Sequence, residues 1–319
     1  MFSRELELRG RAFVNHGALD QVEVKDMTID GFPAKLFFNP ARVRSVMADV
    51  SPEALQKRAC FLCPDGLESL QLTTVWDSPT GQTYFIRVNP FPIFNHHFTI
   101  SSAIHERQTF APHMESMLHL AQAMPEMTIF YNGPMCGASA PDHMHFQAVP
   151  RHSMPIEDHF STNYANAVLV QESDLQSHLA ALEKVLSMAS IPENASQTGS
   201  LTAGASRTEE WEPRWNIISW YEPESSASVV SDLQGKARST GAADLQPTGR
   251  SYNTIMFFRR ESRPQCFFAP ENERILFSPG TVEMGGIGIV ANRESFDRIT
   301  PEVLRSMIQE VSFPITDNQ

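Results

Sequence analysis

Polar and apolar residues alternate along one short segment of the chain, His-Met-His-Phe-Gln-Ala-Val at residues 143–149. This period of two predicts a β-strand, because residues two apart project from the same face of a strand. His143, His145 and Gln147 would then follow one another at intervals of about 6.5 Å on one face. Met144, Phe146 and Ala148 would face the core. Two imidazoles and an amide in a row on one strand indicate a functional site.

Other patterns place strands and a helix around this segment. Runs rich in β-branched and aromatic residues predict strands at 83–88, 97–101 and 127–131. Apolar residues spaced by three and four predict an amphipathic helix over 108–124. A loop of small residues, 132–141, then leads into the histidine-rich strand. The order strand, strand, helix, strand, loop, strand indicates an α+β fold with mainly antiparallel pairing.

The rest of the chain divides at a stretch rich in Ser, Thr, Ala and Gly. Helices are predicted over 52–58, 172–190 and 300–311, the last capped by Thr300 with Pro301 in its first turn, and strands over 215–221, 254–259 and 284–290. We therefore predict an N-terminal half at 1–190, a linker at 191–207 and a C-terminal half at 208–319. Low hydrophobicity at 222–250 predicts a long mobile loop within the second half.

Charge and apolar content narrow the classes of function. With 25 Lys and Arg against 37 Asp and Glu, the formal net charge is −12, which argues against nucleic acid or an anionic membrane as partner. An anionic small substrate would need local arginines. No run approaches the length of a membrane span, and the first residues lack the apolar core of a secretory signal, so we expect a cytoplasmic protein.

Four cysteines in a chain of this size do not form a disulfide scaffold. Cys60 and Cys63 are spaced as metal ligands or as a redox pair. His105 and His143 both lie at the ends of predicted strands, where side chains from separate segments can meet. A tetrahedral Cys2His2 zinc site is one interpretation, and two unrelated core cysteines are the alternative. Because four protein ligands leave no position for water, such a zinc would be structural.

If His143 binds metal, His145 has a separate task. On the same strand face and beside Gln147, its imidazole would be a free nucleophile or base. Gln147 is a neutral hydrogen-bonding group able to hold a phosphate oxygen, so attack on phosphorus is the chemistry that the pair favours. A histidine that simply satisfies its hydrogen bonds in the core is the alternative for His145 taken alone.

Taken together, these motifs resemble the galactose-1-phosphate uridylyltransferase branch of the histidine-triad (HIT) superfamily. The motifs in question are Cys60-Phe-Leu-Cys63-Pro, Asn89-Pro-Phe, Ile104-His105, Asn132-Gly and His143-Met-His145-Phe-Gln147. The run His145-Phe-Gln147-Ala, with Glu283-Met-Gly-Gly, is closer to the GDP-L-galactose phosphorylase and diadenosine tetraphosphate phosphorylase relatives. The resemblance covers about residues 38–150 and, more weakly, 250–311. It implies a HIT-like α+β fold with two related halves, each an antiparallel sheet flanked by helices.

The resemblance also implies a role for each site residue. The cluster of Cys60, Cys63, His105 and His143 would bind structural zinc. His145 would attack the α-phosphorus of a nucleotide to form a covalent nucleotidyl-histidine, and Gln147 would hydrogen-bond the phosphate in the transition state.

Further residues would bind substrate. Asn89 and Asn132 fall where the family contacts ribose and phosphates, and Arg42 and Arg44 could supply local positive charge. Ordinary solvated surface charge is the alternative for both arginines.

Two positions depart from the family pattern. A Ser or Thr usually stands three residues before the zinc-binding histidine as a phosphate contact, but this chain has Ala140 there and Ser139 one residue earlier. Either the loop is re-registered so that Ser139 makes this substrate contact, or backbone N–H groups of 137–140 hold the phosphate. The resemblance also leads us to expect a histidine near Ser262, and this chain has none there, which puts in doubt any acceptor contact made by that residue.

The leading hypothesis is therefore a nucleotidyltransferase or phosphorylase with a nucleotide-sugar or dinucleoside polyphosphate substrate and a phosphate or sugar phosphate acceptor. The resemblance is compatible with a homodimer. One alternative is a non-catalytic, regulatory nucleotide-binding protein of the same fold. A HIT-like pyrophosphohydrolase is the other, and Gln147 disfavours it because the hydrolases carry a third histidine at that position.

Overall fold

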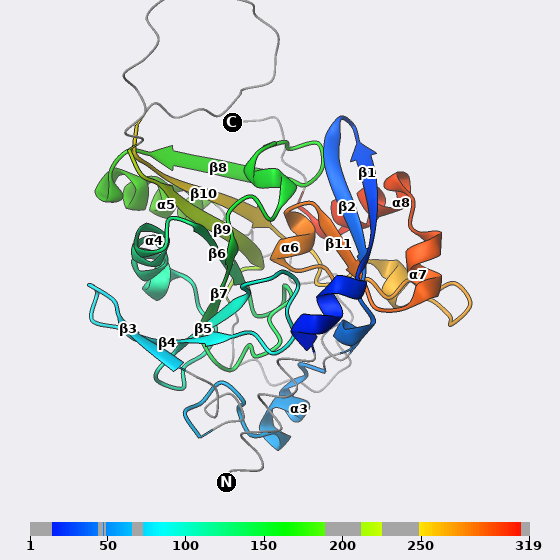
Figure 1. The fold of residues 1–319 in the computed structure, drawn as a ribbon, viewed down its shortest axis with the longest axis horizontal. Helices are drawn as coiled ribbons and strands as arrows, with labels where there is room; N and C mark the ends of the chain where they lie inside the picture. The colour runs from blue at the N-terminus through cyan, green and yellow to red at the C-terminus, as the bar shows by residue number, and fades with distance from the viewer. Residues whose placement is uncertain are drawn as a thin grey trace, which may run out of the picture.

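The computed structural model describes residues 15–43, 47, 49–65, 73–188, 212–224 and 249–313. Its largest element is an eight-stranded sheet in the order β3-β4-β5-β7-β6-β9-β10-β8, in which every neighbouring pair is antiparallel (Figure 1). The strands are β3 (Thr73–Asp77), β4 (Thr83–Val88), β5 (Phe98–Ser102), β6 (Met127–Asn132), β7 (His145–Pro150), β8 (Ala167–Glu172), β9 (Trp215–Glu222) and β10 (Ser251–Phe258).

A smaller sheet joins segments from opposite ends of the chain. It contains β1 (Glu23–Ile29), β2 (Phe32–Phe38) and β11 (Ile287–Val290). The first two strands form a hairpin through Asp30 and Gly31, whose φ angles of 51° and 82° suit the two-residue turn that matches strand twist. β11 pairs with β2 in parallel, so this sheet is mixed.

Helices cover both faces of the large sheet. The α-helices are α3 (Pro52–Lys57), α4 (Met114–Ala123), α5 (Leu175–Met188), α6 (Thr281–Met284), α7 (Arg293–Arg298) and α8 (Pro301–Val311), and 3-10 turns lie at Ala18–Gln21, Pro40–Arg42, Ala111–His113, Pro155–Glu157 and Gln265–Phe267. α4 and α5 pack on one face, while α6 and the small sheet, with α7 and α8, lie on the other (Figure 1). Within the described residues, every helix falls short of the length and apolarity of a membrane span.

The alternation along β7 divides its side chains between the two faces as predicted. Met144, Phe146 and Ala148 are fully buried in the core beneath α4. His145 and Gln147 therefore face the other side, where Phe130 packs with the small sheet and α6. An α+β fold built on antiparallel pairing is confirmed.

Several boundaries differ from the sequence-based expectation. β7 begins at His145, and His143 lies in the turn before it, so the prediction of a strand from His143 was wrong by two residues. The helix expected from residue 108 begins at Met114, because Pro112 lies in a preceding 3-10 turn. The glycine-rich strand expected over 284–290 is the end of α6 followed by β11. Thr300 caps α8 as expected, with its Oγ1 accepting from Val303 N–H at 3.3 Å.

The predicted halves meet within one sheet. β6 pairs with β9, and β8 pairs with β10, so β9 and β10, from after residue 208, lie between two strands from before residue 190 in the large sheet. The linker predicted at 191–207 and most of the loop predicted at 222–250 lie outside the described residues. The domain boundaries at these positions stay predictions.

We expect Phe146→Ala to lower the free energy of unfolding by about 3–5 kcal/mol, because it leaves a cavity in the core beneath α4. Phe146 is 0% exposed, whereas Phe268 is 62% exposed and provides a control of the same chemistry. The free energy of unfolding of Phe268→Ala, measured in urea, should differ from that of wild type by less than about 1 kcal/mol. Similar losses in both variants would contradict the placement of Phe146.

Candidate functional site

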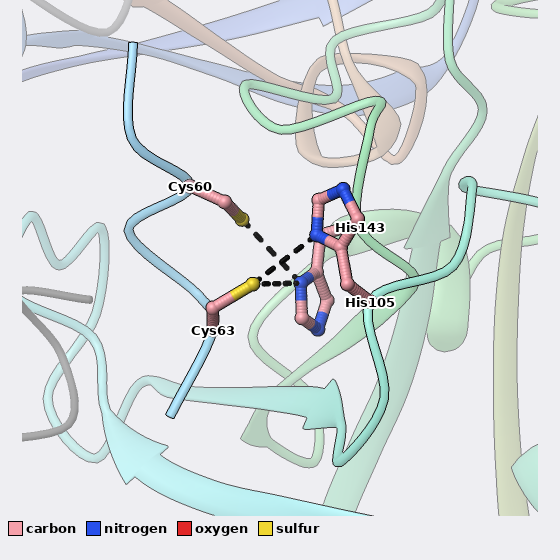
Figure 2. Close-up of side chains that lie close together, drawn as sticks. All are labelled: Cys60, Cys63, His105 and His143. Atoms are coloured by element: carbon pink, nitrogen blue, oxygen red, sulfur yellow. Dashed lines mark hydrogen bonds between the residues drawn. The ribbon is translucent and has the colours of Figure 1, made fainter. Parts of the chain in front are cut away.

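Two cysteines and two histidines from three separate segments converge near the start of β7. Cys60 and Cys63 follow α3, His105 follows β5, and His143 lies in the turn before β7 (Figure 2). Cys63 Sγ is 3.1 Å from His105 Nδ1 and 3.5 Å from His143 Nδ1, and Cys60 Sγ is 3.4 Å from His143 Nδ1. One donor atom from each residue lies within 4.8 Å of all the others. The set of donors, two sulfurs and two imidazole nitrogens, suits a tetrahedral metal ion.

The orientation of His143 is fixed from behind. Its Nε2 lies 2.9 Å from the carbonyl oxygen of Ser102, so Nε2 carries the hydrogen and Nδ1 presents its lone pair to the two thiols. Burial, with the adjacent Cys60 thiol, raises the pKa of Cys63 to about 11. The raised pKa favours the protonated thiol. A divalent cation would favour the deprotonated form instead, because it binds and stabilises thiolates.

Two arginines anchor the segment that carries the cysteines. Arg58 forms an ion pair with Asp142 at 2.6 Å, which ties the residues before Cys60 to the turn at His143. Arg87, buried on β4, donates from Nη1 to the carbonyl oxygen of Leu62 at 3.1 Å. These two arginine contacts therefore hold the four residues of the cluster in place, in addition to the contacts among their own side chains.

His145 is buried beside this cluster but is not part of it. Its Nδ1 lies 2.9 Å from the carbonyl oxygen of His143, and its backbone N–H donates to Gln108 Oε1 at 2.8 Å. Burial lowers the pKa of His145 to about 4, so the ring is neutral at pH 7. Because Nδ1 donates to a carbonyl, the lone pair is on Nε2, for which no hydrogen-bond partner exists among the described residues. A neutral imidazole with a free nitrogen is a competent nucleophile.

Gln147 follows on the same face, and its amide oxygen accepts two hydrogen bonds. His97 Nε2 donates to Gln147 Oε1 at 2.9 Å, and Asn89 Nδ2 donates to it at 3.3 Å. The sequence did not indicate His97 as a site residue. Its only signal was a histidine at the beginning of the strand expected over 97–101. Burial and the charge of Arg42 lower the pKa of His97 to about 3.

The other predicted substrate-binding residues are in varied surroundings. Asn132 Oδ1 accepts from Thr281 N–H at 2.8 Å and from Asn216 Nδ2 at 3.1 Å, so it takes part in the packing of α6. Arg42 donates from Nη1 to the carbonyl oxygen of Phe91 at 2.6 Å. Ser139 is exposed on the loop before His143, and Arg44 lies outside the described residues.

A buried acidic residue and a buried arginine from the C-terminal part of the chain also border this region. Glu283 Oε2 accepts from Gly280 N–H at 2.8 Å, and burial raises the pKa of Glu283, opposed in part by the charge of Arg42. Arg259 donates from Nη2 to the carbonyl oxygen of Ser262 at 3.0 Å, so this backbone oxygen has a structural partner. Neither Arg259 nor the carboxylate of Glu283 was identified from the sequence as a site residue.

A pocket of about 270 Å³ opens next to His97. It is lined by His16, Val88, Asn95, His96, His97 and Phe98. His97 thus lines this pocket and also donates to the amide oxygen of Gln147.

Comparisons with known proteins bear on the fold. A family model described as a domain of unknown function, DUF4922, matches residues 1–150. No curated protein matches the chain. The crystal structure of yeast Ap4A phosphorylase Apa2 is similar at a TM-score of 0.53 with 14% identity, over 96% of this chain and 97% of that one. Its complex with AMP matches at 0.52 with 15% identity over 98% of both chains, and its complex with Ap4A at 0.52 with 14% identity over 96% and 97%. The chain thus has the HIT-like α+β fold.

The buried, neutral His97 should make folding stability depend on pH. The unfolded chain takes up a proton on this histidine near pH 6.5 and the folded chain only near pH 3. The stabilising contribution is therefore complete above pH 6.5 and is lost as the pH falls toward 3. Between pH 7 and pH 5, wild type should lose about 2 kcal/mol more of its unfolding free energy than His97→Gln does.

Urea unfolding at the two pH values measures this difference. Loss of bound metal or protonation of other groups affects both proteins alike. Equal pH dependence in wild type and His97→Gln would show that His97 is not buried in its neutral form.

Proposed function

We propose that this protein is a nucleotidyltransferase or phosphorylase that forms a covalent nucleotidyl intermediate on His145. The observation that carries the proposal is the pairing of His145 and Gln147 on one face of β7. His145 is a buried, neutral imidazole with a free Nε2, and the amide oxygen of Gln147 already accepts two hydrogen bonds. The fold is shared with yeast Ap4A phosphorylase Apa2, structures of which contain AMP and Ap4A. This supports a nucleotide with a phosphoanhydride bond as the substrate.

The reaction then has two steps. In the first, the Nε2 lone pair of His145 attacks the α-phosphorus, a nitrogen–phosphorus bond forms, and the bond to the leaving phosphate breaks. The hydrogen bond from Nδ1 to the carbonyl of His143 stabilises the ring as it becomes positive. Gln147 donates its amide N–H to a phosphoryl oxygen. In the second step an acceptor phosphate or sugar phosphate attacks phosphorus and releases His145.

We further propose that Cys60, Cys63, His105 and His143 hold one structural zinc. The convergence of two thiols and two Nδ1 atoms, and the carbonyl of Ser102 behind His143, support this assignment. When bound, the ion contributes cross-linking of three chain segments and no chemistry on substrate. It would hold the turn from which His145 enters β7.

Intact-mass measurement tests the intermediate. Wild type mixed with Ap4A or with a panel of nucleoside diphosphate sugars, and denatured in base to preserve the nitrogen–phosphorus bond, should gain the mass of one nucleoside monophosphate less water. His145→Ala should show no gain. His152→Ala, which replaces an exposed histidine outside the site, should behave as wild type.

Other outcomes separate the alternatives. Thermal stabilisation by nucleotide without adduct or product would indicate a non-catalytic nucleotide-binding protein. Steady release of nucleoside monophosphate in water, without an acceptor, would indicate a hydrolase. Absence of an adduct across the panel, with wild type and His145→Ala indistinguishable, would disprove the proposed intermediate.

Elemental analysis tests the metal. Purified wild type should contain about one zinc per chain, and cobalt-substituted protein should show thiolate-to-metal absorption. Cys63→Ser should lose most of the metal and unfold at lower temperature, as should chelated wild type. Cys266→Ser is the matched control, because Cys266 is a free cysteine outside the cluster. Wild type without tetrahedral metal even after zinc addition would contradict the assignment.

A further inference from the structure

The side-chain amide of Gln147 can be placed in either of two orientations, and its neighbours decide between them. If the oxygen faces His97 and Asn89, the NH2 group points away from them, and the reverse orientation exchanges these groups. Only a free NH2 group can donate to a phosphoryl oxygen. The usefulness of Gln147 to the reaction therefore depends on which hydrogen-bonding groups His97 and Asn89 present.

The backbone determines what His97 presents. Ile93 N–H donates to His97 Nδ1 at 3.1 Å, so Nδ1 must carry the lone pair. A neutral ring then has its hydrogen on Nε2. Since Nε2 lies 2.9 Å from the amide of Gln147, the atom that it meets must be the oxygen.

Asn89 leads to the same result through a separate backbone group. Phe91 N–H donates to Asn89 Oδ1 at 2.8 Å, which fixes the orientation of that amide and leaves Nδ2 as a donor. Nδ2 reaches Gln147 Oε1 at 3.3 Å. The nitrogens of Asn89 and His97 are 3.4 Å apart because both converge on this one oxygen.

We propose that His97 and Asn89 are positioning residues that orient the amide of Gln147, so that its NH2 group faces the phosphorus attacked by His145. Two backbone N–H groups of the 89–97 turn, those of Phe91 and Ile93, set this orientation. Among the described residues Gln147 Nε2 has no hydrogen-bond partner, so the NH2 group is available to a ligand. This inference rests on the proposed function for the identity of that ligand.

Two substitutions of His97 separate positioning from packing. The oxygen of Asn can take the place of Nδ1 and accept from Ile93, but its short side chain cannot donate to Gln147. Gln is longer, and its NH2 group can take the place of Nε2 and donate to Gln147. His97→Asn should therefore lose the orientation of Gln147, and His97→Gln should recover it.

Single-turnover formation of the His145 adduct from Ap4A provides the kinetic test. His97→Asn should slow the maximal rate about 100-fold, the usual loss for a donor to a developing charge, while the Ap4A concentration giving half the maximal rate changes less than about twofold. His97→Gln should restore most of that rate. His178→Asn, which alters a buried histidine bonded to Thr254 outside the site, should leave the rate unchanged. Thermal unfolding shows whether each variant is folded.

An unchanged rate in His97→Asn would overturn the proposal. So would an equal loss in folded His97→Gln and His97→Asn, because packing and not the donor would then be responsible. Asn89 is the weaker target for this test, since it is also a predicted substrate contact.

A second measurement needs no turnover. The side-chain NH2 resonances of Gln147, identified by their absence in Gln147→Glu, should be nearly the same in wild type and His97→Gln and should shift in His97→Asn. Unmoved resonances in His97→Asn would overturn the positioning role even if the adduct forms. If wild type forms no adduct but the resonances respond as expected, the proposed function fails and the orientation of Gln147 stands.

Discussion

The position of β7 between β5 and β6 is the constraint on which the rest of the structure depends. A strand with neighbours on both sides has its register fixed by two ladders, with Ser101 opposite His145 on one side and Phe130 opposite Gln147 on the other. A shift of one residue would exchange the core-facing and site-facing side chains. Full burial of Phe146 under α4 opposes such a shift, so the apolar half of the strand holds the polar half in place.

The buried histidines of the site share one electrostatic property. Removal from water disfavours the charged ring, and it is the largest cause of the lowered pKa of both His97 and His145. A neutral ring has one donor and one acceptor, so each hydrogen bond to one nitrogen fixes the role of the other. Backbone groups therefore determine that His145 offers a lone pair at Nε2 and that His97 offers a hydrogen. Burial keeps both rings neutral, and the backbone hydrogen bonds then select the tautomer of each ring that the proposed chemistry needs.

Local patterns in the sequence indicated many of the helices and strands, though not all of their bounds, and the metal-ligand candidates. Alternation predicted which side chains of β7 face the core, and the spacing of Cys60 and Cys63 together with histidines at strand ends indicated that the four residues meet. The face of a strand and the Cys-x-x-Cys spacing depend on neighbours along the chain. The meeting of Cys60 with His143, 83 residues away, was instead expected from the position of that histidine at a strand end and from the resemblance. The turn at His143 was missed because the alternating pattern continues through it, although its backbone N–H bonds to the Ala140 carbonyl at 3.1 Å.

Contacts between distant residues could not be read in the same way. His97 lies fifty residues from Gln147, and nothing in its own surroundings in the sequence indicates the hydrogen bond between them. Asn132 was expected at the substrate, yet its amide oxygen bonds to Thr281, 149 residues away. These long-range hydrogen bonds depend on the order of the strands in the sheet. The periodicity of apolar residues and the spacing of motifs do not specify that order.

The C-terminal part of the chain is needed for the site even though most of the chemical motifs precede residue 150. The loop that leads into β7 turns at Gly137 with φ of 98°, and a Cβ there would lie 2.7 Å from the Cα of Gly280. Only glycine permits both the angle and the approach. Asn216 also holds this loop, because its Nδ2 donates to the carbonyl oxygen of Cys136 at 2.7 Å. Arg259 in turn donates to Asn216 Oδ1 at 2.7 Å. The loop before His143 is thus packed on residues from the C-terminal part, so the shape of the site depends on both parts of the chain.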